Sequence, residues 1–65
     1  MSCYIHRKYW FGVKGDLTKA LADPDAPTTS EGHRLTASDF EPVSAEEYDN
    51  DAILDLRYEN DEWQQ

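Results

Sequence analysis

The stretch CYIHRKYWFGV, residues 3–13, decides the fold of this 65-residue chain. Its side chains alternate along the backbone, and the more apolar face holds Cys3, Ile5, Tyr9, Phe11 and Val13. Alternation with a period of two, together with β-branched and aromatic residues, is typical of a β-strand. We therefore predict one strand over residues 3–13, which the nearby glycines would let bulge or turn at its end.

A short helix is predicted after this strand, over DLTKALA at residues 16–22. Asp16 has a side chain suited to accept hydrogen bonds from the first free N–H groups of a helix. The helix should end at Asp23, because the following proline disfavours helical backbone at the residue before it. Residues 23–33, DPDAPTTSEGH, have the composition of a loop, and we expect it to be the most mobile segment.

The next segment predicts one irregular element and one helix. Residues 34–43, RLTASDFEPV, favour a short strand or a single turn, because Pro42 would interrupt a helix. Ser44 and Glu47 have the spacing of a capping box, in which each side chain bonds a free backbone N–H group. This box predicts a short acidic helix over residues 45–50.

A second alternating segment, AILDLRYE at residues 52–59, predicts another strand. On such a strand Asp55 and Glu59 share a face and lie about 13 Å apart. The tail after it, NDEWQQ, either docks onto the domain through Trp63 or frays. The residues do not decide between these two alternatives.

These elements predict one α+β domain over residues 1–65, with a small antiparallel sheet of two to three strands and one or two short helices. A sheet of that size needs a helix or a partner over one face to be stable. Both a monomer and a homodimer would meet this need. The chain begins with Met1, shows no signal sequence and has no run of about 18 apolar residues, so we expect a complete, cytoplasmic gene product.

The charge is large and unevenly placed. The chain carries a net charge of −8. Residues 1–22 hold four Lys or Arg and one Asp, whereas residues 23–65 hold thirteen Asp or Glu and two Arg. Nucleic-acid phosphates and anionic membranes would be repelled by such a surface. The charge therefore favours a basic protein surface as the partner, without direct nucleic-acid or membrane binding.

Metal and cofactor sites are not expected. Cys3 is the single cysteine, so no internal disulfide can form, and with His6 and His33 it gives no zinc-ligand spacing. We interpret the two histidines as surface residues and Cys3 as a small packed thiol. Asp49, Asp51 and Asp55 resemble part of a calcium loop, but the glycine and the final acidic residue of that loop are missing. No metal or cofactor is therefore predicted.

An enzymatic role is not expected either. Glu46 and Glu47 are adjacent carboxylates, but acid–base catalysis needs a cleft that shifts a pKa, and a short solvated helix offers none. The sequence has no Gly-rich phosphate loop and no nucleophile elbow. We predict a protein without catalytic residues.

The acidic run over residues 39–62 is the strongest functional signal. It contains ten carboxylates and one basic residue, Arg57. A high density of charges of one sign opposes folding, because the charges repel one another. This cost favours a role in binding a partner over a role in solubility alone. Rows of carboxylates can imitate DNA phosphates, and Tyr58 and Trp63 could supply apolar anchors. The predicted partner-binding residues are Asp39, Glu41, Glu46, Glu47, Asp49, Asp51, Asp55, Glu59, Asp61 and Glu62.

In size and charge the chain resembles the small acidic inhibitors of phages and mobile elements, chiefly through residues 39–62. It is most similar to anti-CRISPR proteins of the DNA-mimic type, including those directed at type I effectors. This resemblance implies a host-defence inhibitor in the bacterial cytoplasm. Its partner would be the basic surface with which a CRISPR effector, such as a Cascade subunit, reads the protospacer-adjacent motif (PAM).

Two alternatives stay open. The segments Ser38–Glu41 and Ile53–Arg57 are loosely similar to phage inhibitors of uracil-DNA glycosylase. That likeness implies a DNA mimic directed at another host DNA-binding enzyme, such as a glycosylase, a restriction enzyme or a polymerase. The other alternative is a plain acidic protein-interaction module whose charge serves solubility.

Overall fold

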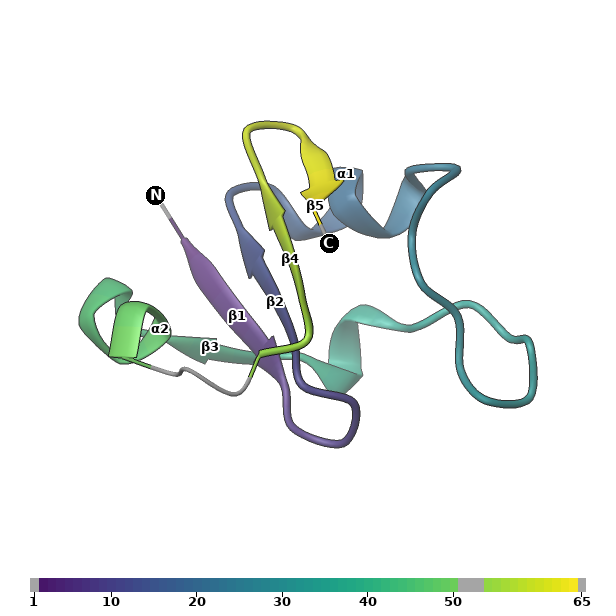
Figure 1. Ribbon diagram of the computed structural model, residues 1–65, viewed down its shortest axis with the longest axis horizontal. Helices are drawn as coiled ribbons and strands as arrows, with labels where there is room; N and C mark the ends of the chain where they lie inside the picture. The colour runs from purple at the N-terminus through teal and green to yellow at the C-terminus, as the bar shows by residue number, and fades with distance from the viewer. Residues whose placement is uncertain (1, 51–53, 65) are drawn as a thin grey trace.

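The computed structural model describes residues 2–50 and 54–64 and shows that the first alternating stretch is a β-hairpin (Figure 1). β1 (Cys3–His6) pairs antiparallel with β2 (Phe11–Lys14), and a four-residue turn joins them at residues 7–10. The predicted single strand over residues 3–13 is therefore wrong.

Trp10 forms the turn that the sequence pattern did not reveal. Its backbone is left-handed, with a φ of 61°, and its N–H donates to the His6 carbonyl at 2.7 Å. Few residues other than Gly, Asn and Asp adopt this conformation, so no common turn signal marks the position. Tertiary contacts support it. The half-buried ring packs against the buried cluster of Cys3, Ile5 and Tyr48, and the Trp10 carbonyl accepts from the Asp55 N–H at 2.8 Å.

The first helix confirms the prediction for residues 16–22. α1 (Leu17–Ala22) begins after Asp16, whose Oδ1 accepts from the Lys19 N–H at 3.2 Å. The helix ends at Asp23, which has extended backbone and precedes proline. Ala20 is the buried residue of this helix. A side-chain cap at one end and a proline at the other thus set its length.

The sheet has five strands in the order β3-β1-β2-β4-β5. The added strands are β3 (Glu41–Val43), β4 (Leu56–Glu59) and β5 (Glu62–Gln64). Neighbouring strands are antiparallel except β2 and β4, which are parallel. The fold class is α+β as predicted, but the expected antiparallel sheet of two to three strands is too small, because the hairpin was taken as one strand and the tail was not assigned to the sheet.

The middle of the chain matches the remaining expectations in part. A 3₁₀ turn, η1 (Ala37–Asp39), precedes β3, in agreement with a turn or short strand over residues 34–43. α2 (Ala45–Asn50) confirms the predicted helix, and the Glu47 N–H bonds Ser44 Oγ at 3.0 Å. Of the strand predicted over residues 52–59, β4 confirms residues 56–59, whereas residues 54 and 55 precede the strand; residues 52 and 53 lie outside the described residues.

The sheet buries side chains on both faces. One cluster packs with α1 and consists of Val13, Ala20, Leu35, Phe40 and Tyr58, with Trp63 against it. The other packs with α2 and consists of Cys3, Ile5 and Tyr48. Figure 1 shows the two helices at opposite sides of the molecule. A small domain divided into two clusters depends strongly on each of its few buried side chains.

Candidate partner-binding site

The predicted binding carboxylates are spread over several elements. Those described are Asp39 in η1, Glu41 in β3, Glu46, Glu47 and Asp49 in α2, Asp55 just before β4, Glu59 in β4, Asp61 in the β4–β5 turn and Glu62 in β5. Asp51 lies outside the described residues. In Figure 1, α2 lies beyond β3 at the lower left, whereas the β4–β5 turn is at the top. The carboxylates therefore fall into groups with different surroundings.

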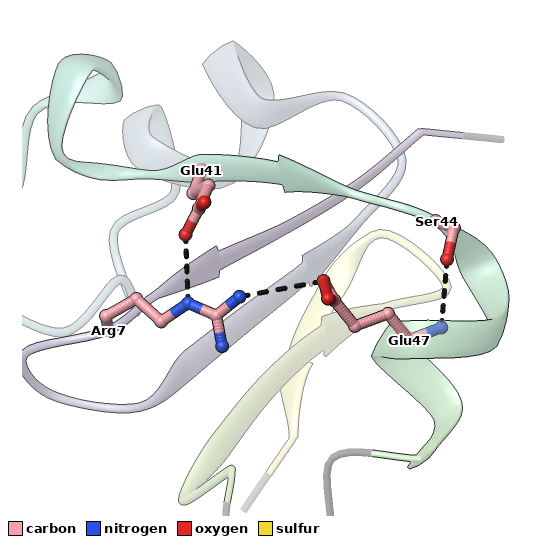
Figure 2. A network of polar contacts seen from close by, with 4 residues as sticks. All are labelled: Arg7, Glu41, Ser44 and Glu47. Atoms are coloured by element: carbon pink, nitrogen blue, oxygen red, sulfur yellow. Dashed lines mark hydrogen bonds and ion pairs between the residues drawn. The ribbon is translucent and has the colours of Figure 1, made fainter.

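Arg7 neutralises two of these carboxylates (Figure 2). It extends from the hairpin turn, and its Nε donates to Glu41 Oε2 at 2.9 Å. Its terminal nitrogen lies 3.6 Å from Glu47 Oε2, so one guanidinium joins β3 to α2. The three side chains are about half exposed, and such pairs contribute about 0.2–1 kcal/mol each. Both carboxylates therefore already have an intramolecular partner, although they remain about half exposed.

Glu59 makes contacts inside the protein that support the fold. The Tyr48 hydroxyl donates to Glu59 Oε2 at 3.1 Å, and Arg57 lies 3.9 Å from the same oxygen. The Arg57 guanidinium also lies over the Tyr48 ring, 5.0 Å from its centroid. Burial, followed by the negative charge of Glu59, raises the pKa of the Tyr48 hydroxyl well above its usual value. Glu59 thus connects β4 to α2.

Two more carboxylates have partners inside the protein. Asp61 Oδ1 lies 3.1 Å from Lys19 Nζ, and this contact raises the pKa of the lysine. Asp39 Oδ2 accepts from the Thr36 hydroxyl at 2.8 Å. These contacts are at exposed positions, where they are screened by water and salt. Both carboxylates remain accessible, but each already has a partner.

The exposed carboxylates Glu46, Asp49, Asp55 and Glu62 make no ion pair with any residue in the described ranges. Glu46 and Asp49 are three residues apart and therefore neighbours on the surface of α2. β4 begins at Leu56, so Asp55 precedes the strand on which it was predicted to share a face with Glu59. The best defined exposed acidic surface is therefore that of α2.

The structure corrects two predictions about uncharged residues. Tyr58 is 1% exposed, so it cannot be an apolar anchor for a partner. Trp63 packs edge-on against Tyr58, with ring centroids 5.3 Å apart, and belongs to the same cluster. His6 was interpreted as a surface residue, yet it is 4% exposed. Cys3 is buried, as expected for a packed thiol.

Tyr48→Phe and Tyr58→Phe test the assignment of Glu59 as a structural residue. Tyr48→Phe should lower the free energy of unfolding by about 1–2 kcal/mol, because it removes a hydrogen bond to a charged acceptor. Tyr58→Phe should leave stability unchanged or slightly raised, because the Tyr58 hydroxyl is buried without a partner among the described residues. Urea unfolding of both variants measures the difference. Equal losses of unfolding free energy in the two variants would contradict the structural role of Glu59.

No protein-family model, curated protein or solved structure matches the chain. Within residues 2–50 and 54–64, no helix is long and apolar enough to cross a membrane. The same part of the chain contains no group of three or more His, Cys, Asp or Glu side chains placed to hold a metal ion. What the protein can bind must follow from its own charges and contacts.

Proposed function

We propose that this protein is an anti-CRISPR-type inhibitor that mimics DNA through an acidic face and acts in the host bacterial cytoplasm. Its exposed carboxylates bind the basic DNA- and PAM-binding surface of a CRISPR effector complex, such as a Cascade subunit, and thereby exclude target DNA. The supporting observation is the exposed pair Glu46 and Asp49 on α2, which has no basic counterpart among the described residues, in a chain of net charge −8.

The physical basis is charge complementarity. Lysines and arginines that line a DNA-binding channel repel one another when the channel is empty, and carboxylates stabilise them as phosphates do. Opposite net charges also accelerate the encounter of the two proteins at low salt. Asp55 and Glu62 extend the negative potential beyond α2. The protein needs no catalytic group and no cofactor for this role.

The same physics would serve against another host DNA-binding enzyme, such as uracil-DNA glycosylase, a restriction enzyme or a polymerase. One observation favours the plainer alternative of an acidic interaction module. Glu41, Glu47 and Asp61 are paired inside the molecule, so part of the charge supports the fold. The two roles differ in whether the remaining carboxylates are required for inhibition.

Charge reversal on α2 tests the proposal. The variant Glu46→Lys with Asp49→Lys should lose about tenfold or more in competition with PAM-containing duplex DNA for a purified type I effector, equivalent to about 1.4 kcal/mol or more. Inhibition by the unmodified protein should weaken as salt rises, because exposed charges are screened beyond about 8–10 Å. Fluorescence anisotropy of labelled DNA gives both measurements.

The matched control is Asp25→Lys with Glu31→Lys, which changes the net charge equally in the loop at residues 23–33. It should inhibit nearly as well as the unmodified protein, and circular dichroism should show both variants folded. A folded α2 variant with undiminished potency would contradict the assignment of the binding face. Absence of binding to any type I effector, with retention of a different DNA-binding enzyme from lysate, would favour the second target class.

A further inference from the structure

A cavity of about 430 Å³ lies between the hairpin turn and the loop that follows α1. The end of β1 and the turn contribute residues 6–9, the loop contributes Thr29, Glu31 and His33, and Asp39 completes the lining. No carboxylate of α2 lines the cavity, and none of its histidine, lysine or threonine side chains has a part in the proposed inhibition. It therefore needs an explanation of its own.

His6 is the buried polar group of this cavity. The ring is 4% exposed and contacts Tyr9 and Phe40 with centroid distances of 5.1 Å. Its Nδ1 accepts from the Tyr9 N–H at 3.3 Å, so the neutral ring carries its proton on Nε2. Nε2 makes no hydrogen bond with a residue in the described ranges, and His6 lines the cavity. A buried polar ring thus lines the cavity.

The opposite wall is held in place by hydrogen bonds. Thr29 Oγ1 accepts from the Glu31 and His33 N–H groups at 3.3 and 3.1 Å, which leaves the hydroxyl proton available as a second donor. The nearby side chain and backbone of Ser30 are the main causes that lower the pKa of the Tyr9 hydroxyl. The loop conformation is thus fixed by its own hydrogen bonds, and the loop lines the cavity together with the hairpin turn.

Two charges of opposite sign remain for a ligand. Lys8 Nζ lies over the Tyr9 ring, 5.4 Å from its centroid, and has no ion pair with a residue in the described ranges. Glu31 is exposed on the loop side and likewise makes no ion pair there. Arg7 is engaged by two carboxylates, and Asp39 by the Thr36 hydroxyl. Lys8 and Glu31 therefore dominate the charge pattern that a ligand would meet.

We propose that this cavity binds a small zwitterion of the free amino acid class. The carboxylate would be bound by Lys8 and the His6 Nε2–H, and the ammonium group by Glu31. A simple anion would be opposed by the net charge of −8, whereas a zwitterion carries no net charge and matches both signs. The three groups that would hold the ligand are not among the exposed carboxylates proposed to bind an effector, and the site is tested on the free protein.

The test is an NMR titration at constant ionic strength with glycine and L-alanine, and with acetate and methylammonium as probes of one charge each. Saturable shifts are expected at His6, Tyr9 and Thr29 with the amino acids, at millimolar affinity, and much weaker effects with either probe. Lys8→Gln and Glu31→Gln should each weaken amino acid binding at least several-fold. Lys14→Gln, which removes the same charge from β2 outside the cavity, should not.

Three results would overturn the proposal. One is the absence of saturable shifts with both amino acids. Another is acetate binding as tightly as glycine with no effect of Glu31→Gln, which would identify a plain oxyanion site. The third is an equal loss of affinity in Lys14→Gln, which would identify non-specific attraction. None of these readouts involves an effector, so they stand apart from the test of inhibition.

Discussion

Gly12→Ala is expected to lower the free energy of unfolding by about 3 kcal/mol, the upper end of the usual cost of overpacking a core. A Cβ atom at this position would lie 2.7 Å from Tyr48 Cε2 and 2.8 Å from Leu54 Cδ1. Real Cβ atoms do not approach other carbon atoms so closely. The Tyr48 ring is fully buried and its hydroxyl is bonded to Glu59, so the ring cannot move aside without losing that contact.

Gly32→Ala is the matched control for this variant. Gly32 has a φ of 85°, and nothing lies within 4 Å of its added Cβ, so the cost there is backbone strain alone, about 1 kcal/mol. Adding Tyr48→Leu to Gly12→Ala should cost less than the two changes separately, because the ring that clashes is gone. Equal stability of Gly12→Ala and the unmodified protein in urea would contradict the described packing.

Trp63→Ala is expected to destabilise the protein by about 3 kcal/mol, the lower end of the range for core aromatic truncations, since Trp63 is half-buried. Its indole Nε1–H donates to the Ala20 carbonyl at 3.0 Å, which fixes β5 against α1. Its ring also covers Tyr58. In a domain of 65 residues, a loss of this size should leave a measurable unfolded fraction at 37 °C, visible by circular dichroism.

Trp63→Phe separates the two contributions. It keeps an aromatic ring against Tyr58 and removes the donor to Ala20, so its stability should lie between those of the alanine variant and the unmodified protein. Lys14→Gln is the control. Lys14 is half-buried but belongs to neither hydrophobic cluster, so this variant should leave the free energy of unfolding nearly unchanged. A Trp63→Ala variant with an unchanged urea midpoint would mean that the C-terminal strand does not contribute to the core.

The elements that could be predicted from the sequence are those fixed by neighbouring residues. Asp16 and Ser44 accept hydrogen bonds from N–H groups three residues later, so their helices are encoded locally. The hairpin turn is different. It depends on Trp10 in a left-handed conformation, and packing against a cluster that includes the distant Tyr48 holds that side chain in place. The tail was ambiguous for the same reason, because Trp63 finds its partner 43 residues earlier.

The candidate site also has features that the sequence predicts and features that depend on contacts between distant residues. Composition and charge order along the chain were sufficient to identify the acidic half. Which carboxylates are neutralised depends on contacts such as Arg7 with Glu41, 34 residues apart, and no spacing rule predicts them. His6 was misjudged because a single histidine in an alternating stretch gives no sign of burial. Its environment includes Phe40, which only the folded sheet brings close.

The parallel pairing of β2 with β4 determines when this protein can fold. Phe11 lies opposite Leu56, so the central pair of the sheet joins segments separated by most of the chain. The hairpin can form as soon as its residues are synthesised, but the strand beside it follows 45 residues later, counted from Phe11 to Leu56. Pairings of such long sequence separation slow folding, because a long loop must close first. Until then one edge of β2 stays open, and the nascent chain is exposed to association with other chains.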